Sequence, residues 1–197
     1  MFNLSTERDN PALRSELDKI TRVFTGDEVS EQIPAIAALT SRFDHDISLE
    51  AEALPGDRRS WRYTCFQHAF ELVDPPRLII KIANCGEGVH INGEFVDFLT
   101  SNVLSAEAPE QVADGDVVVY SSNGSPKHAG KCRAERVVSK WGDFHLWRHR
   151  VLEVPMRYGS TVRFYRSISR QVSVEAFIEH ATSKLGRTRI GRLWGAP

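Results

Sequence analysis

The chain has 197 residues, of which 41% are hydrophobic and 26% are charged, and its formal net charge is −1. This composition is ordinary for a globular domain that is long enough to bury a core. It excludes proteins that recruit nucleic acid through a strong overall positive charge, so we expect no nucleic-acid partner. The first residues lack the basic and apolar segments of a signal peptide, and no apolar run reaches membrane-spanning length. We therefore expect no membrane span, and a protein that is cytoplasmic or exported without a signal peptide.

Three cysteines, Cys65, Cys85 and Cys132, are widely spaced and form no C-x-x-C motif. An odd number at such spacing indicates neither a disulfide framework nor a cysteine zinc site. We expect reduced thiols, no metal and no cofactor.

Two amphipathic segments open the chain. Asn10 and Pro11 have the pattern of a helix cap followed by the first helical residue, and Gly26 is expected to end this helix. A second helix is predicted from Ser30, with Pro34 in its first turn. The polar stretch that follows is typical of a connection, so residues 1–60 are predicted to form a helical layer and a linker.

A short helix is predicted to begin at Cys65. Thr64 is placed to cap it, apolar residues recur at helical spacing through Val73, and Pro75 ends it. Unpaired N–H groups and the positive end of the helix dipole favour a thiolate at this position. Cys65 is therefore a candidate nucleophile, although a buried structural cysteine has the same sequence pattern.

The rest of the chain predicts strands first and a terminal helix last. A helix capped by Asn92 is expected after the first of these strands, and the last helix is expected from a Ser173 cap to Gly186. The predicted strands span residues 77–83, 115–120, 127–133, 136–141 and 161–166. Helices followed by an antiparallel meander indicate an α+β fold. Residues 169–197 are assigned to a C-terminal helix and a basic tail, and the tail is expected to be dispensable for folding.

A cysteine nucleophile needs a base within hydrogen-bond reach, and the base needs a polar group that fixes its tautomer. His128 opens a predicted strand beside the small residues Ala129 and Gly130, which leave room for a helix to approach. His68 is a rival base because it lies three residues after Cys65 on the same helical face. We favour His128, since a packing role is commoner for a histidine placed as His68 is.

The order of these motifs resembles that of the NlpC-type and CHAP-type cysteine peptidases and amidases. The order is Cys65 on a helix, a Gly-Asp strand at 115–120, a His-Ala-Gly strand at 128–130, and Arg-Val-Val-Ser at 136–139. The resemblance covers residues 61–168 and implies a papain-like fold with N-terminal helices packed on an antiparallel sheet.

The sequence is also similar to an uncharacterised branch of that superfamily. The shared motifs are Thr64-Cys65, the His-Ala pair, Ser-Lys-Trp-Gly at 139–142, a later histidine at His149, and Tyr-Gly at 158–159. The branch usually has asparagine in place of Thr64, and an aromatic residue in place of His68.

The resemblance implies roles for seven residues. Cys65 is the nucleophile, His128 is the base, and either Ser139 or His149 is the third catalytic member. The backbone N–H of Cys65 is the expected oxyanion donor. The remaining expected substrate-binding residues are Tyr63, Gln67 and Trp141.

The implied reaction is cleavage of an amide bond through an acyl-thioester on the cysteine. The substrate would be a peptide, a peptidoglycan-like amide or a protein target. One alternative is a catalytically silent binding module of the same fold. Another is an acyltransferase or deamidase acting as an effector or toxin, in which case a cognate inhibitor protein is expected.

A zinc site is a further alternative for the function of the chain. His145, His149 and Glu153 recur every four residues, which would align three ligands on one face of a helix. Pro155 and the absence of an identifiable carboxylate to support the ligands argue against that helix and against the site.

Overall fold

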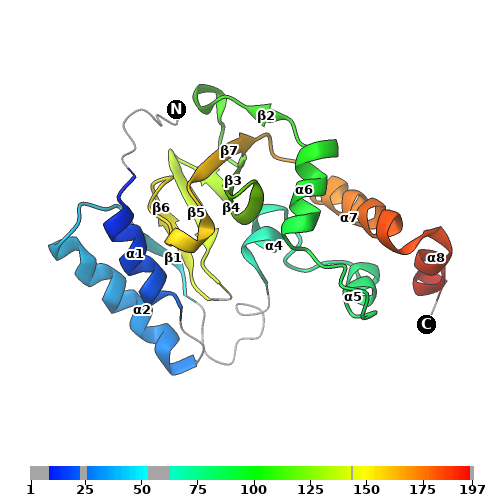
Figure 1. The fold of residues 1–197 in the computed structure, drawn as a ribbon, viewed down its shortest axis with the longest axis horizontal. Coiled ribbons are helices and arrows are strands. Elements are labelled where there is room, and N and C mark those ends of the chain that lie inside the picture. The colour runs from blue at the N-terminus through cyan, green and yellow to red at the C-terminus, as the bar shows by residue number, and fades with distance from the viewer. Residues whose placement is uncertain (1–8, 23–25, 53–62, 143, 196–197) are drawn as a thin grey trace.

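The computed structural model describes residues 9–22, 26–52, 63–142 and 144–195, and their fold is α+β. A seven-stranded antiparallel sheet lies between helices α1 and α2 on one side and helices α4 to α8 on the other (Figure 1). The strands are β1 (Ser48–Ala51), β2 (Ala106–Glu107), β3 (Val117–Ser122), β4 (Ser125–Arg133), β5 (Arg136–Lys140), β6 (Leu146–His149) and β7 (Thr161–Tyr165). Their spatial order is β1-β6-β5-β4-β3-β7-β2.

The helices vary in length from one turn to more than four. They are α1 (Pro11–Ile20), α2 (Gly26–Ala38), α4 (Cys65–Ala69), α5 (Arg77–Ala83), α6 (Gly93–Asn102), α7 (Arg170–Leu185) and α8 (Arg187–Gly195). Short 3-10 helices are η2 (Leu39–Ser41), η3 (Pro109–Gln111) and η4 (Met156–Tyr158). Within the described residues, no helix is both long and apolar enough to cross a membrane.

The hairpin of β3 and β4 sets the two faces of the sheet. Asn123 and Gly124 form its turn, and both have positive φ, 52° and 76°, as a type I′ turn requires. Val119 pairs with Ala129, and Tyr120 pairs with His128. Because successive side chains of a strand point to opposite faces, Ala129 and His128 point to opposite sides of the sheet.

Each face of the sheet supports its own hydrophobic core. The first core lies under α4 to α8 and contains Phe66, Phe70, Phe95, Val117, Val119, Ala129, Phe177 and Ile190, among others. The second core lies under α1, α2 and η4 and contains Leu13, Leu17, Ile36, Val118, Tyr120, Cys132, Trp141, Trp147 and Tyr158, among others. Aromatic edge-to-face contacts hold the first core, as between Phe95 and Phe177, whose centroids are 5.2 Å apart.

Most of the predicted strands are confirmed, but the prediction of a strand at residues 77–83 is wrong. This segment is α5, which begins after Pro76 and buries Ile79 and Ile82, three residues apart. A run of seven residues of which five are apolar fits a buried helix as well as a strand, and tertiary packing decides between them. The strand prediction failed because the sequence supplied no alternation that excluded a helix.

The N-terminal segment differs from the prediction in two respects. The Asn10 cap of α1 is confirmed by a hydrogen bond from the Leu13 N–H, at 3.1 Å. However, α2 begins at Gly26, so that Pro34 lies inside the helix and not in its first turn. Part of the predicted linker forms β1, which pairs with β6 at the edge of the sheet, while residues 53–60 lie outside the described residues.

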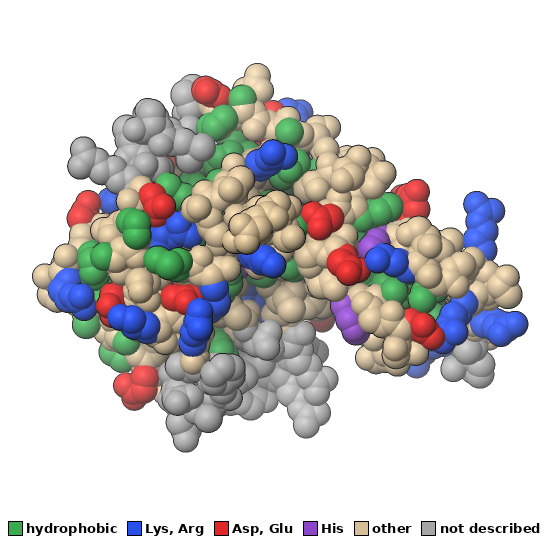
Figure 2. Space-filling model, viewed as in Figure 1, with side chains coloured by type: hydrophobic (Ala, Val, Ile, Leu, Met, Phe, Trp, Pro, Cys, Tyr) green, Lys and Arg blue, Asp and Glu red, His purple; other side chains and the backbone are tan. Residues whose placement is uncertain are grey.

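The C-terminal region also differs. The cap of α7 is Ser169, whereas Ser173 is buried inside the helix. The predicted tail forms α8, which packs against α5 and α7 and places Ile190 in the first core. Figure 2 shows basic side chains at the end of the molecule that α8 forms. Because α8 buries part of the core, the expectation that the tail is dispensable for folding conflicts with its packing.

Candidate active site around Cys65 and His128

Helix α4 begins at Cys65 because Thr64 caps it. The Thr64 hydroxyl accepts a hydrogen bond from the Gln67 N–H at 3.3 Å, and the Gln67 side chain accepts one from the Thr64 N–H at 2.8 Å. This reciprocal pair is a capping box, and it fixes the cysteine as the first helical residue. The helix ends at Ala69 and Glu71 adopts a positive φ of 59°, so the predicted extension to Val73 is wrong.

The short length of α4 weakens one part of the sequence argument. The helix dipole sums aligned peptide units, and α4 has only five residues. Activation of the thiol therefore depends on the groups around it more than on the dipole. Cys65 is partly buried against the first core.

His128 lies on β4 and its side chain is fully buried on the second-core face. Its ring stacks on Tyr158, with centroids 3.9 Å apart and planes within 6°. Neither ring nitrogen has a hydrogen-bond partner among the described residues. Burial, followed by the positive charges of His149, Arg157 and His68, holds the pKa of His128 well below its usual value. A neutral imidazole with free nitrogens is chemically able to accept a proton.

Electrostatic effects connect α4, which carries Cys65, with β4, which carries His128. Helix α4 packs against β4 and β5. Burial raises the pKa of Tyr158, and the negative charge of Cys65 raises it further. His68 similarly lowers the pKa of His128. The thiol therefore lies near the ring that stacks on His128, although neither imidazole nitrogen of His128 has a hydrogen-bond partner among the described residues.

Ser139 and His149 form a buried chain of hydrogen bonds in which His128 takes no part. The His149 Nδ1 is 2.7 Å from the Arg150 carbonyl, which only accepts, so this nitrogen carries the proton. The Nε2 of His149 then accepts from the Ser139 hydroxyl at 2.8 Å, and Ser139 accepts from the Trp141 indole N–H at 3.1 Å. Neither residue orients His128 by a direct hydrogen bond, contrary to the role implied for a third catalytic member.

The three residues expected to bind substrate have different surroundings. Trp141 is fully buried and stacks on Trp147, which places it in the core and contradicts a direct contact with substrate. Gln67 is engaged in the capping box. Tyr63 is half-buried, and the Lys140 ammonium lies 3.9 Å from the centre of its ring, a cation–π contact.

His68 is partly buried, as a packing histidine at this position is expected to be. Its pKa is lowered to about 4 by burial, with smaller contributions from the charges of Lys131 and Lys140. Its ring stacks on Tyr63, with centroids 6.2 Å apart. These contacts agree with a packing role.

Tyr158 and Arg157 lie beside His128, although the sequence predicted no role for either residue. The Tyr158 hydroxyl accepts a hydrogen bond from the Gly142 N–H at 2.9 Å. Arg157 holds Tyr158 in place through a cation–π contact of 4.8 Å, while its guanidinium donates to Asp18 at 2.8 Å. The Tyr-Gly motif was the available signal, but it did not indicate a stacking partner for the histidine.

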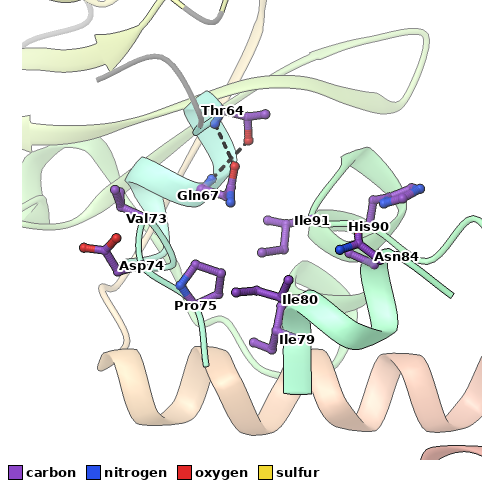
Figure 3. Close-up of a pocket in the computed structure, with 11 residues that line it drawn as sticks. Thr64, Gln67, Val73, Asp74, Pro75, Ile79, Ile80, Asn84, His90 and Ile91 are labelled. Atoms are coloured by element: carbon purple, nitrogen blue, oxygen red, sulfur yellow. Dashed lines mark hydrogen bonds between the residues drawn. The ribbon is translucent and has the colours of Figure 1, made fainter. Parts of the chain in front are cut away.

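A cavity of about 660 Å³ adjoins the start of α4 (Figure 3). Thr64 and Gln67 form one wall, and α5 forms another. The cavity is lined by Thr64, Gln67, Val73, Asp74, Pro75, Ile79, Ile80, Ala83, Asn84, His90 and Ile91. The cavity is large enough for a small ligand, and it reaches Thr64, the residue that precedes Cys65.

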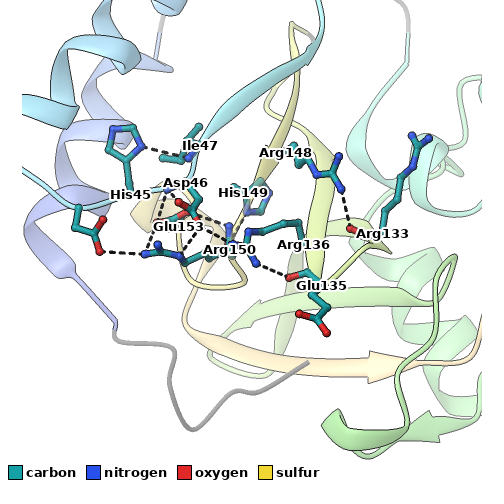
Figure 4. A network of polar contacts seen from close by, with 11 residues as sticks. His45, Asp46, Ile47, Arg133, Glu135, Arg136, Arg148, His149, Arg150 and Glu153 are labelled. Carbon is teal, nitrogen blue, oxygen red and sulfur yellow. Dashed lines mark hydrogen bonds and ion pairs between the residues drawn. The ribbon is translucent and has the colours of Figure 1, made fainter. Parts of the chain in front are cut away.

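A separate network of charged side chains lies at an edge of the second core (Figure 4). Asp46 accepts from Arg136 and from Arg150, the latter at 2.9 Å, and Glu153 accepts from the Arg150 N–H at 2.9 Å. Burial raises the pKa of Glu153. His149 ends β6, so the helix that a zinc site would require does not form.

Comparison with known proteins identifies no relative: no family model, no curated protein and no solved structure matches the chain.

Proposed function

We propose that the protein is a papain-like cysteine hydrolase of the NlpC and CHAP kind that cleaves an amide bond. The observation that supports this proposal best is the convergence of α4 and β4. Cys65 begins a capped helix that packs against β4, the strand that carries His128, and the His128 ring stacks on Tyr158.

The reaction uses the thiol as nucleophile and the imidazole as base. His128 takes the Cys65 proton, the sulfur attacks the amide carbonyl carbon, and the oxyanion is stabilised by the backbone N–H of Cys65. The C–N bond breaks as His128 returns the proton to the leaving amine. Water then attacks the thioester with His128 again as base, which releases the acid and restores the thiol. This mechanism requires the thiol and the imidazole to come within hydrogen-bond reach when substrate binds, since catalytic hydrogen bonds commonly tighten in the complex.

Burial of His128 favours a second candidate, a catalytically silent binding module. The imidazole has 0% exposure and points toward the second core, whereas α4 covers the first. In such a module the histidine serves only as a stacking partner of Tyr158.

Thiol alkylation with intact-mass detection separates the two candidates. Near pH 6, limiting iodoacetamide is expected to label Cys65 first. Cys132 is an internal control, since burial, and then the charges of Asp116 and Asp114, raise its pKa to about 12. His128→Gln is expected to slow labelling of Cys65 about 100-fold if the imidazole acts as base, whereas His68→Gln is not.

Two results would count against the hydrolase. One is equal labelling rates in His128→Gln and the unmodified protein, and the other is preferential labelling of Cys85. Screening of muropeptide and protein substrates then follows, with Cys65→Ser expected to abolish turnover while circular dichroism remains unchanged.

A further inference from the structure

The cavity beside Cys65 has an apolar floor. Its lining includes three isoleucines, Ile79, Ile80 and Ile91, together with Val73 and Pro75. In Figure 3 the three isoleucines and the proline gather between Gln67 and Asn84. Ile80 is 46% exposed, so an apolar surface is already open at this point. A ligand group that covers it must be apolar for the contact to be favourable.

The polar groups of the lining do not provide a site for an anion. None of the described residues that line the cavity is lysine or arginine, and its acidic member is Asp74. The Asp74 carboxylate points away from the isoleucines in Figure 3. Gln67 is occupied by its hydrogen bond to the Thr64 N–H. His90 also lines the cavity, but with no lysine or arginine beside it among the described residues, so a substrate group rich in carboxylates, such as the stem of a muropeptide, would find no permanently charged cation here.

We propose that this cavity binds an aliphatic acyl chain of the substrate, so that the group transferred to Cys65 is a hydrophobic acyl group. The assignment rests on the proposed function, because it supposes that the thioester forms on Cys65. The volume of about 660 Å³ lies within the range of small-ligand sites, roughly 300 to 1,000 Å³. Its wall includes Thr64, the residue before the nucleophile, so the cavity lies at the start of the helix that carries Cys65.

A series of p-nitrophenyl esters, from acetate to octanoate, tests the assignment. The Cys65 sulfur bonds to the carbonyl carbon, the ester C–O bond breaks, p-nitrophenolate leaves, and the thiol proton passes to the buffer. Water later releases the carboxylic acid and restores the thiol. The second-order rate of the p-nitrophenolate burst is expected to rise about threefold to fourfold for each added CH₂, as burial of a methylene predicts, until the cavity is full.

Ile80→Glu places a carboxylate in the cavity and is expected to remove the dependence of the burst rate on chain length. Val172→Glu is the matched control, because Val172 is an exposed apolar residue on a helix that does not line the cavity. Melting curves of both variants establish that they fold.

The outcomes separate the two proposals. A Cys65-dependent burst with equal rates for all chain lengths, or an unaltered dependence in Ile80→Glu, overturns the assignment of the cavity and leaves the cysteine hydrolase standing. A burst that persists in Cys65→Ala, or no burst with any ester, overturns the proposed function and the cavity assignment with it.

Discussion

The two faces of the sheet are stabilised in different ways. On the second-core face, buried polar side chains are linked by specific hydrogen bonds, as in the chain from Trp141 through Ser139 to His149. On the first-core face, apolar contacts dominate, and a cavity remains between α4 and α5. Fully satisfied polar networks fix one arrangement of their members, whereas apolar contacts do not depend on direction. The second-core face therefore holds Ser139 and His149 in place by directed hydrogen bonds, and the first-core face offers space for a ligand.

The largest effect that tests this comparison is expected at Arg14. It is buried, and its guanidinium donates to the Val154 carbonyl at 3.1 Å and also to the Gly159 carbonyl. Arg14→Met leaves both carbonyls without a donor, and the free energy of unfolding should fall by about 3 to 5 kcal/mol in urea denaturation. Arg22→Met is the control, since the Arg22 side chain is 63% exposed and its pair with Asp18 is worth about 0.5 kcal/mol. Equal effects of the two variants would show that the second-core face does not depend on its buried hydrogen bonds.

A smaller effect is expected from titration of His149. Burial lowers its folded-state pKa to about 4. Its unfolded-state pKa lies near 6.5, so the unfolded chain binds more protons between these values. The stabilisation that this group provides is present above pH 6.5 and is lost as the pH falls through 4.

His149→Gln removes this titration while keeping an acceptor for the Ser139 hydroxyl. Between pH 7 and pH 4.5 the stability of the unmodified protein should fall about 2 kcal/mol more than that of the variant, as measured by urea denaturation at each pH. Parallel pH profiles would show that His149 titrates alike in the folded and unfolded chains.

Local sequence signals were sufficient for some elements because the physics that fixes them is local. The Asn10, Thr64 and Asn92 caps accept hydrogen bonds within three residues, and β3 and β4 are joined by a turn with its own signature at 123–124. The helix at 77–83 was mistaken for a strand, since burial between α7 and α8 is a tertiary effect. Ser169 and Ser173 are equally good caps by residue type, and only packing distinguishes them.

The candidate site could be predicted only as a set of residues. The motif order named Cys65 and His128, and α4 does pack on β4. Which face the imidazole occupies depends on strand register, and one residue of register reverses it. Tyr158 reaches His128 from η4, thirty residues along the chain, so its stacking had no local signal. The partner of Ser139 was likewise decided by the pairing of β5 with β6, which brings His149 beside it.

The smallest expected effect concerns the first-core face at Thr64. Thr64→Ala removes the acceptor for the Gln67 N–H, and loss of such a cap costs about 1 kcal/mol in free energy of unfolding. Thr64→Ser keeps the hydroxyl and should lose only a small part of that stability. Because α4 has five residues, loss of its cap should also change the surroundings of Cys65, which iodoacetamide labelling at fixed pH would detect. If Thr64→Ala and Thr64→Ser unfold alike and label alike, then packing on β4 alone sets the start of α4. In that case the first-core face would be as firmly held at the cysteine as the second-core face is at His128.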